Sequence, residues 1–233
     1  MSPTDDTPRP PRAFFGRRKG HALKPRQAGL FETLLPRLAI DLGMPAPSEL
    51  TCLFRTPVDN VRLEIGFGGG EHMIAEAARN PRTGFVGIEP FINGMAKALA
   101  AIDDHQLTNV RLYHGDAVEL VAWLPPAALA RVDLLYPDPW PKRRHWKRRF
   151  VQDESIAKIA RILRPGGEFR FATDIPGYAA WTLKRLERSV DFEWTAERAD
   201  DWRLPWPDFS STRYEAKAQR EGRVPCYLIF RRR

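Results

Sequence analysis

Apolar residues recur along this chain in two alternating patterns, which predict strands and helices in turn. Short apolar runs rich in Val, Ile, Leu and Phe are typical of buried strands. Such runs lie at residues 61–66, 84–89, 110–114, 131–136, 168–173 and 224–231, with a weaker one at 192–196. Segments with helical spacing fill the gaps, and residues 30–42 also have amphipathic spacing despite Pro36. This alternation predicts an α/β fold in which helices flank a mostly parallel sheet.

The length of the chain predicts a single folded domain with an N-terminal extension. A chain of 233 residues with 43% hydrophobic content is long enough to bury one sizeable core. Residues 1–28 are rich in proline and basic residues and poor in aliphatic ones, so we expect a flexible arm there. Phe14 and Phe15 suggest that part of this arm docks on the body of the protein or on an RNA. The folded domain is therefore predicted to span residues 29–233.

The net charge of the chain indicates which kind of partner it binds. The formal net charge of +8 favours an anionic partner, either a nucleic acid or an acidic membrane surface. No apolar run approaches the roughly 18 residues that a membrane span requires, and the N-terminus lacks a signal-peptide pattern. Cys52 and Cys226 are far apart and no His cluster has ligand spacing, so neither a disulfide framework nor a metal site is indicated. We expect a soluble, cytoplasmic protein.

The segment Leu135–Phe150, LYPDPWPKRRHWKRRF, joins a rigid carboxylate to a cationic run. Pro137 and Pro139 end the predicted strand and stiffen the backbone around Asp138. Six basic residues follow within eight positions, with His145 and Trp146 among them, which suits phosphate contacts and base stacking. A solvated run of surface charge is the alternative interpretation. The segment favours chemistry on a nucleic acid.

A glycine-rich turn follows the first predicted strand in the motif LEIGFGGG. Gly66 and Gly68 allow the backbone to approach a ligand closely at the carboxyl end of the strand. Glu89 ends the second predicted strand, where an acidic side chain can hold both ribose hydroxyls of an adenosine. Turns of this kind also serve NAD or FAD, or only a tight turn, so the motif does not by itself identify the ligand.

Two further acidic residues indicate which of these candidate ligands the site binds. Asp116 follows the third predicted strand, where it suits the adenine amino group, and Glu64 lies within the glycine motif, where it suits a methionyl ammonium. Three carboxylates would repel a pyrophosphate, whereas S-adenosylmethionine carries a sulfonium and an ammonium and no phosphate. For each acid the alternative is a helix N-cap or first-turn residue.

Taken together, these motifs resemble the bacterial tRNA (guanine-N7)-methyltransferase family of the class I methyltransferase superfamily. The resemblance covers nearly everything from Leu63 to the C-terminus. It rests on LEIGFGGG, VGIEP (Val86–Pro90), HGDA (His114–Ala117), YPDPWPKRRHWKRR, LRPGGEFRFATD (Leu163–Asp174) and STRYE (Ser211–Glu215). It implies a Rossmann-like, mostly parallel seven-stranded sheet with an antiparallel last strand. It also implies methyl transfer from S-adenosylmethionine to N7 of guanine 46 in the variable loop of tRNA.

The resemblance also implies roles for individual residues. Cofactor contacts are implied at Glu64, Gly66, Gly68, Glu89, Asp116 and Asp138. Substrate contacts are implied at Lys142, Asp174, Thr212, Arg213, Tyr214 and Glu215, and RNA contacts at Arg144, His145, Trp146, Lys147, Arg148 and Arg149. Relatives commonly show Lys in place of Arg213, a change that keeps the charge.

Guanine N7 is unprotonated at neutral pH, so its methylation needs no strong general base. The product ring is cationic, and a carboxylate held nearby stabilises the charge that develops in the transition state. We therefore assign this catalytic role to Asp138. An ion pair of Asp138 with Lys142 or an arginine is the structural alternative, and an N-cap is the alternative for Asp174.

Three other functions remain open on the sequence alone. A nucleotide-dependent dehydrogenase would share the glycine turn but needs a proton-relay pair near the fourth predicted strand, and none is evident. A non-catalytic RNA-binding module would bind RNA without the cofactor, which the three acids argue against. A methyltransferase for another RNA or for a small molecule would share the fold and the cofactor.

Overall fold

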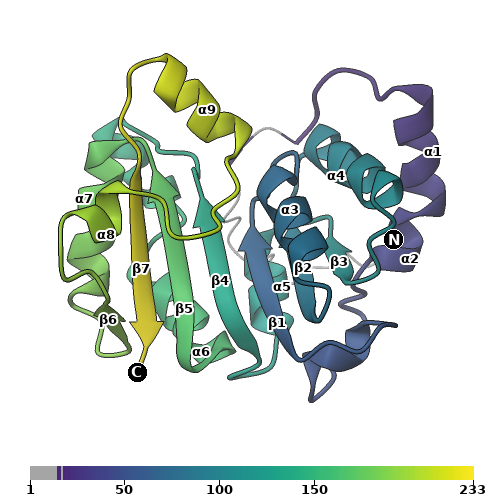
Figure 1. Cartoon of the computed structure of the whole chain (residues 1–233), viewed down its shortest axis with the longest axis horizontal. Coiled ribbons are helices and arrows are strands. Elements are labelled where there is room, and N and C mark those ends of the chain that lie inside the picture. Colours follow the sequence, from purple (N-terminus) through teal and green to yellow (C-terminus); the bar gives the residue numbers. More distant parts are fainter. Residues whose placement is uncertain (1–14, 17) are drawn as a thin grey trace, which may run out of the picture.

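The protein is built around one seven-stranded sheet (Figure 1). The computed structural model describes residues 15–16 and 18–233. The strands are β1 (Asn60–Ile65), β2 (Thr83–Ile88), β3 (Val110–Tyr113), β4 (Leu129–Leu135), β5 (Leu163–Thr173), β6 (Phe192–Trp194) and β7 (Cys226–Arg232). Their order is β3-β2-β1-β4-β5-β7-β6, and β7 pairs antiparallel with both β5 and β6. The predicted fold class, with its antiparallel last strand, is confirmed.

Helices cover both faces of this sheet, with α3 and α4 in front and α5 and α6 behind in Figure 1. The helices are α1 (Pro25–Thr33), α2 (Leu35–Leu38), α3 (Glu71–Arg79), α4 (Ile92–Asp104), α5 (Ala117–Trp123), α6 (Asp153–Ile162), α7 (Pro176–Leu186), α8 (Asp200–Arg203) and α9 (Arg213–Arg220), with 3₁₀ turns η1 (Leu50–Leu53) and η2 (Arg143–Arg148). Because helices α3 to α7 connect parallel strands, the carboxyl ends of β1, β2, β4 and β5 meet at one edge.

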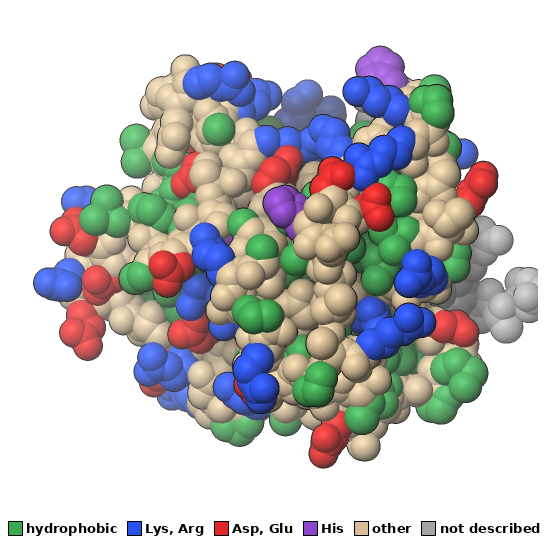
Figure 2. Space-filling model, turned by 45° about the vertical axis from the view of Figure 1, so that its right-hand side comes forward, with side chains coloured by type: hydrophobic (Ala, Val, Ile, Leu, Met, Phe, Trp, Pro, Cys, Tyr) green, Lys and Arg blue, Asp and Glu red, His purple; other side chains and the backbone are tan. Residues whose placement is uncertain are grey.

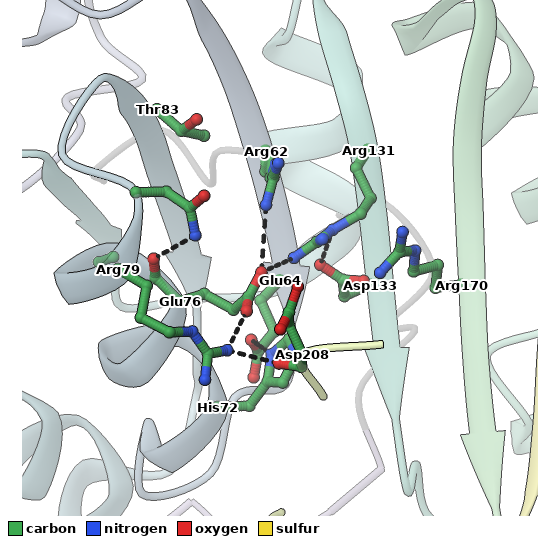
Figure 3. Close-up of polar contacts among 12 residues, drawn as sticks. Arg62, Glu64, His72, Glu76, Arg79, Thr83, Arg131, Asp133, Arg170 and Asp208 are labelled. Carbon is green, nitrogen blue, oxygen red and sulfur yellow. Dashed lines mark hydrogen bonds and ion pairs between the residues drawn. The ribbon is translucent and has the colours of Figure 1, made fainter. Parts of the chain in front are cut away.

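Strand β1 shows how the sheet divides apolar from charged side chains. Leu63 and Ile65 point to the larger hydrophobic core, where they join residues of α5 and α6. Arg62 and Glu64 alternate with them and face the other side. There Arg62 lies opposite Arg131 of β4, and Glu76 of α3 accepts from their guanidinium groups at 3.1 and 2.8 Å. A buried charged cluster therefore holds α3 against the sheet (Figure 3).

The helix predicted over residues 30–42 is wrong in its extent. The structure has two short helices, α1 and α2, and the chain is extended from Ala39, which bridges to Leu112. Pro36 has no N–H for the helical ladder, so it disrupts a continuous helix and instead lies in the first turn of α2. Four residues at the start of the predicted loop 200–208 also form a helix, α8.

The described part of the N-terminal arm lies against α4. The N–H of Ile92 donates to the carbonyl of Arg18 at 3.0 Å, and Asn93 Oδ1 accepts from the N–H of Gly20 at 2.7 Å. The predicted division after residue 28 falls inside α1, and residues 1–14 and 17 lie outside the described residues. Within the described ranges, no helix has the length and apolar content needed to cross a bilayer.

Candidate functional site

A cavity of about 350 Å³ opens at the carboxyl edge of the parallel strands. The ends of β1, β2 and β4 form its walls, together with the segment that follows β4 and the start of α9. Of the predicted cofactor residues, the cavity is lined by Gly66, Gly68, Glu89, Asp116 and Asp138. Residues that follow different strands, far apart in the sequence, therefore converge on one concave site.

The glycine turn between β1 and α3 brings the cavity wall close to α9. Gly66, Gly68 and Gly70 all have positive φ, at 70°, 59° and 84°, which L side chains rarely adopt. A Cβ on Gly68 would lie 3.3 Å from both the Arg213 guanidinium and the Tyr214 ring. Glycine at this position therefore allows α9 to approach the turn.

Glu89 follows β2 and is buried in the cavity wall. Its two carboxylate oxygens accept from the N–H of Gly68 at 2.6 Å and from the N–H of Phe91 at 2.8 Å. Burial raises the pKa of Glu89 to about 7, although both backbone donors act in the opposite direction. The carboxylate is thus fixed in position and sensitive to pH near neutrality.

Asp116 is the N-cap that the alternative interpretation predicted, and it also lies in the cavity lining. It caps α5, because its carboxylate accepts from the N–H of Val118 at 3.0 Å, and it also lines the cavity. The cap fixes the side chain at the end of β3.

Asp138 lies at the cavity rim with its side chain accessible to solvent. Tyr136 and Trp140, two residues away on either side, have left-handed φ values of 49° and 42°. Such conformations are costly for non-glycine residues and are concentrated at functional sites. Partial desolvation by the cavity wall raises the pKa of Asp138. The backbone between the two prolines therefore holds this carboxylate at the rim.

Glu64 differs from the other predicted cofactor residues. Among the described residues that line the cavity, Glu64 does not appear. Its carboxylate is buried, and Oε2 lies 2.7 Å from Nδ1 of His72. Burial raises the pKa of Glu64. The cofactor contact that the resemblance implies for Glu64 therefore stays a prediction.

The predicted substrate motif begins α9. Thr212 caps the helix by accepting from the N–H of Glu215 at 3.1 Å. Arg213 and Tyr214 line the cavity. Glu215 is buried, and the hydroxyl of Tyr227 donates to its carboxylate. The motif thus divides into two residues that face the cavity and two that anchor the helix.

Asp174 follows β5 and pairs with Arg223 at 2.6 Å. Helix α7 begins at Pro176 with Ile175 as its N-cap, so the N-cap alternative for Asp174 is wrong. The ion pair instead joins the end of β5 to the segment between α9 and β7.

The basic run after Asp138 contains residues in different environments. Lys142, Arg144 and Lys147 are exposed, and His145, Trp146 and Arg148 are partly buried. Arg148 lines the cavity and stacks on the rings of Phe15 and Trp140, with its Cζ 5.3 and 5.0 Å from their centroids. Figure 2 shows Lys and Arg side chains gathered along the top of the molecule, the edge at which α9 lies in Figure 1.

The burial of Arg149 contradicts the RNA contact predicted for this residue. It is 4% exposed, and its guanidinium donates to the carbonyls of Pro139 at 2.8 Å and Gly177 at 3.2 Å. The same group lies over the rings of Trp146, Tyr178 and Trp181. Its charge is engaged inside the protein, where an RNA phosphate has no access.

Several cavity residues were not assigned from the sequence. Tyr136, Phe91 and Trp140 line the cavity, as do Phe15 and Gly16 from the N-terminal arm. The position of Tyr136, between the end of a predicted strand and Pro137, is a signal that could have found it. Of the two residues expected to dock, Phe15 packs against Trp140 and Arg148, and Phe14 lies outside the described residues.

Comparisons with known proteins identify the family of this chain. Residues 59–227 match a family model described as "Putative methyltransferase". A tRNA (guanine-N(7)-)-methyltransferase of Nitrobacter hamburgensis is 63% identical over 220 residues, which cover 94% of this chain and 86% of that protein. A protein of the same name from Rhodopseudomonas palustris is 62% identical over 234 residues, which cover 99% of this chain and 93% of that one.

Solved structures of lower identity share the fold. The 16S rRNA methyltransferase KamB is similar at a TM-score of 0.52 and 18% identity, covering 76% of this chain and 90% of that one. TrmN from Thermus thermophilus is similar at a TM-score of 0.53 and 15% identity, covering 79% and 47%. On the family match and the two close relatives, the chain belongs to the tRNA (guanine-N7)-methyltransferase family.

Proposed function

We propose that this protein transfers a methyl group from S-adenosylmethionine to N7 of guanine in tRNA, at position 46 of the variable loop. One observation carries the proposal: an acid-lined cavity opens beside exposed basic residues, in a chain that belongs to this enzyme family. A tRNA substrate implies that the protein acts in the cytoplasm.

The residues present fit the cofactor. Glu89, Asp116 and Asp138 give the cavity a negative lining, which suits the sulfonium and ammonium of S-adenosylmethionine and disfavours a pyrophosphate. We assign Glu89 to the ribose hydroxyls and Asp116 to the adenine amino group. Gly66 and Gly68 provide the close backbone approach that a ligand at this edge needs.

When bound, the cofactor supplies an electrophilic methyl group on sulfur. The protein's own contribution is to orient the guanine and to stabilise charge. We propose that Asp138 at the rim stabilises the positive charge that develops on the guanine ring. Asp174 and Glu215 lie outside the cavity lining, and we propose that either of them reads the N1 and N2 donors of the base. Arg223 and Tyr227 keep these two carboxylates in place. Arg213 and Tyr214 orient the base at the cavity wall.

The exposed basic residues provide the RNA contacts. Lys142, Arg144 and Lys147 are placed to meet phosphates beside the cavity, and His145 and Trp146 offer rings for stacking. Arg148 contacts the RNA from the cavity rim, where it lies between Phe15 and Trp140.

Incubation with methyl-labelled S-adenosylmethionine and unmodified tRNA tests the proposal. After nuclease digestion we expect the label in 7-methylguanosine, and a tRNA with guanine 46 replaced by adenine is expected to accept none. Label in another nucleoside would overturn the pocket assignment but keep the cofactor. Tight tRNA binding without any transfer would favour an RNA-binding module.

A further inference from the structure

His72 is a deeply buried residue to which the resemblance gives no role. It lies in the first turn of α3, directly after the glycine turn, and 1% of its surface is exposed. Its Nδ1 lies 2.7 Å from Oε2 of Glu64. An ionised carboxylate only accepts hydrogen bonds, so Nδ1 is the donor in this pair whenever Glu64 is ionised. Figure 3 shows the two side chains next to the cluster around Glu76.

This hydrogen bond closes the base of the glycine turn. Glu64 is one residue before the end of β1, and His72 is the second residue of α3, so the bond joins the two elements that the turn connects. Gly66, Gly68 and Gly70 have no side chains that fix the turn from within. A hydrogen bond in a buried, low-dielectric environment is strong, and it fixes the distance between β1 and α3.

The ring of His72 also contacts a second segment of the chain. Its centroid lies 5.4 Å from that of Phe209, in the segment 204–212 that leads to α9. Phe209 also packs edge-on against Trp206 and Tyr227, at centroid distances of 5.0 and 5.4 Å. Tyr227 in turn donates to Glu215 of the substrate motif.

Helix α3 holds this segment at a second point as well. Arg79 donates to the carbonyl of Asp208 at 2.5 Å and also pairs with Glu76 (Figure 3). The segment that places Thr212 and Glu215 is therefore held by the same helix that ends the glycine turn.

The two ring nitrogens of His72 lie in different environments. Nδ1 bonds Glu64, whereas Nε2 is buried and has no hydrogen-bond partner among residues 15–16 and 18–233. The ring thus acts as a polar group toward the turn and as a flat packing surface toward Phe209. Asparagine would reproduce the first property, and phenylalanine the second.

We propose that His72 is a positioning residue that aligns the glycine turn with the substrate motif of α9. Through Glu64 it sets the turn that lines the cofactor cavity, and through Phe209 it sets the segment that carries Thr212 to Glu215. His72 does not touch the reacting groups. The inference rests on the proposed function, because it takes the cavity beside the turn as the cofactor site.

Two variants separate the two contacts of His72. His72→Asn keeps a donor for Glu64 and removes the ring, so cofactor affinity is expected to stay within about threefold while KM for tRNA rises about tenfold. His72→Phe keeps the ring and removes the donor, so the cofactor Kd is expected to rise about tenfold with a smaller change in KM for tRNA. Cofactor Kd is measured by calorimetry and KM by methyl transfer.

Phe209→Leu guards against a folding artefact, because it is expected to reproduce the tRNA effect of His72→Asn from the other side of the contact. Phe192→Leu removes a buried ring from edge strand β6 and controls for lost stability alone. Equal changes in both constants for the two His72 variants, or no change in either, would overturn the inference. Failure of the unaltered protein to bind the cofactor or methylate tRNA would instead count against the proposed function.

Discussion

Asp138 stands between two prolines and two residues with left-handed backbone, so its carboxylate has little freedom to leave the cavity rim. We expect Asp138→Ala to lower kcat about 100-fold or more, because a fixed charge at a developing cation acts mainly in the transition state. The Kd for tRNA is expected to change less than about threefold, since phosphate contacts dominate affinity. Single-turnover methylation measures the catalytic rate, and filter binding measures the Kd for tRNA. Near-normal turnover would remove Asp138 from the mechanism.

If Glu89 binds the ribose as proposed, we expect cofactor binding to depend on pH. Its pKa of about 7 lies above the ordinary value of 4.5 because the carboxylate is buried. Only the ionised form accepts hydrogen bonds from both ribose hydroxyls, so cofactor affinity is expected to rise with pH through about 7 and then to level off. The effect on stability has the opposite sign: the favourable contribution of protonated Glu89 is present below pH 4.5 and lost as pH rises through 7. Titration calorimetry from pH 5 to 9 tests the first effect, and a pH-independent affinity would contradict it.

Among the secondary-structure elements, α3 depends on a buried charge for its contact with β1 and β4. Hydrogen bonding and charge from Arg131 outweigh burial and lower the pKa of Glu76 to about 2. Its stabilising contribution is therefore present above the ordinary value of 4.5 and lost as pH falls toward 2. Glu76→Gln is expected to lower the free energy of unfolding by about 3 kcal/mol at pH 7 and by roughly half of that or less at pH 3. Urea denaturation measures this, and Glu71→Gln on the exposed side of α3 is the matched control.

The turn η2 is fixed in place by Arg149. Because its guanidinium is buried among three rings and two backbone carbonyls, we expect Arg149→Ala to lower the free energy of unfolding by about 2 to 4 kcal/mol. Arg144→Ala changes an exposed residue of the same turn and is expected to leave stability within about 0.5 kcal/mol. Thermal unfolding of both variants checks the contrast. Equal, small losses would place Arg149 back among the RNA contacts.

Across the whole molecule, the hydrophobic pattern predicted the strands and the edge where the site forms. The runs at 61–66 and 84–89 differ from β1 and β2 by one residue at each end, because buried parallel strands carry a strong apolar signal. The pattern did not predict that Arg131 and Arg149 are buried, because each is stabilised by partners far away in the sequence. Likewise, Glu64 lies in the expected motif, but the pattern did not predict its contact with His72. That contact depends on how α3 packs against β1.

The charge distribution of the whole molecule leads to a prediction about salt. Lys142, Arg144 and Lys147 are exposed in the segment between Trp140 and Arg148, two residues that line the cavity, whereas Lys184 and Arg188 are exposed near the end of α7. Because α7 begins just after β5 and runs back along the sheet, its end lies toward the opposite edge. Only the first group is expected to displace counterions from bound tRNA.

The double variant Arg144→Ala/Lys147→Ala removes two phosphate contacts. We expect the slope of log Kobs for tRNA against log salt to become shallower by roughly 1.5 to 2. Lys184→Ala/Arg188→Ala removes the same net charge, and its slope is expected to match that of the unaltered protein. Binding is measured between low and physiological salt for all three proteins. Identical slopes for the two variants would mean that net charge alone, and not the basic residues of η2, attracts the RNA.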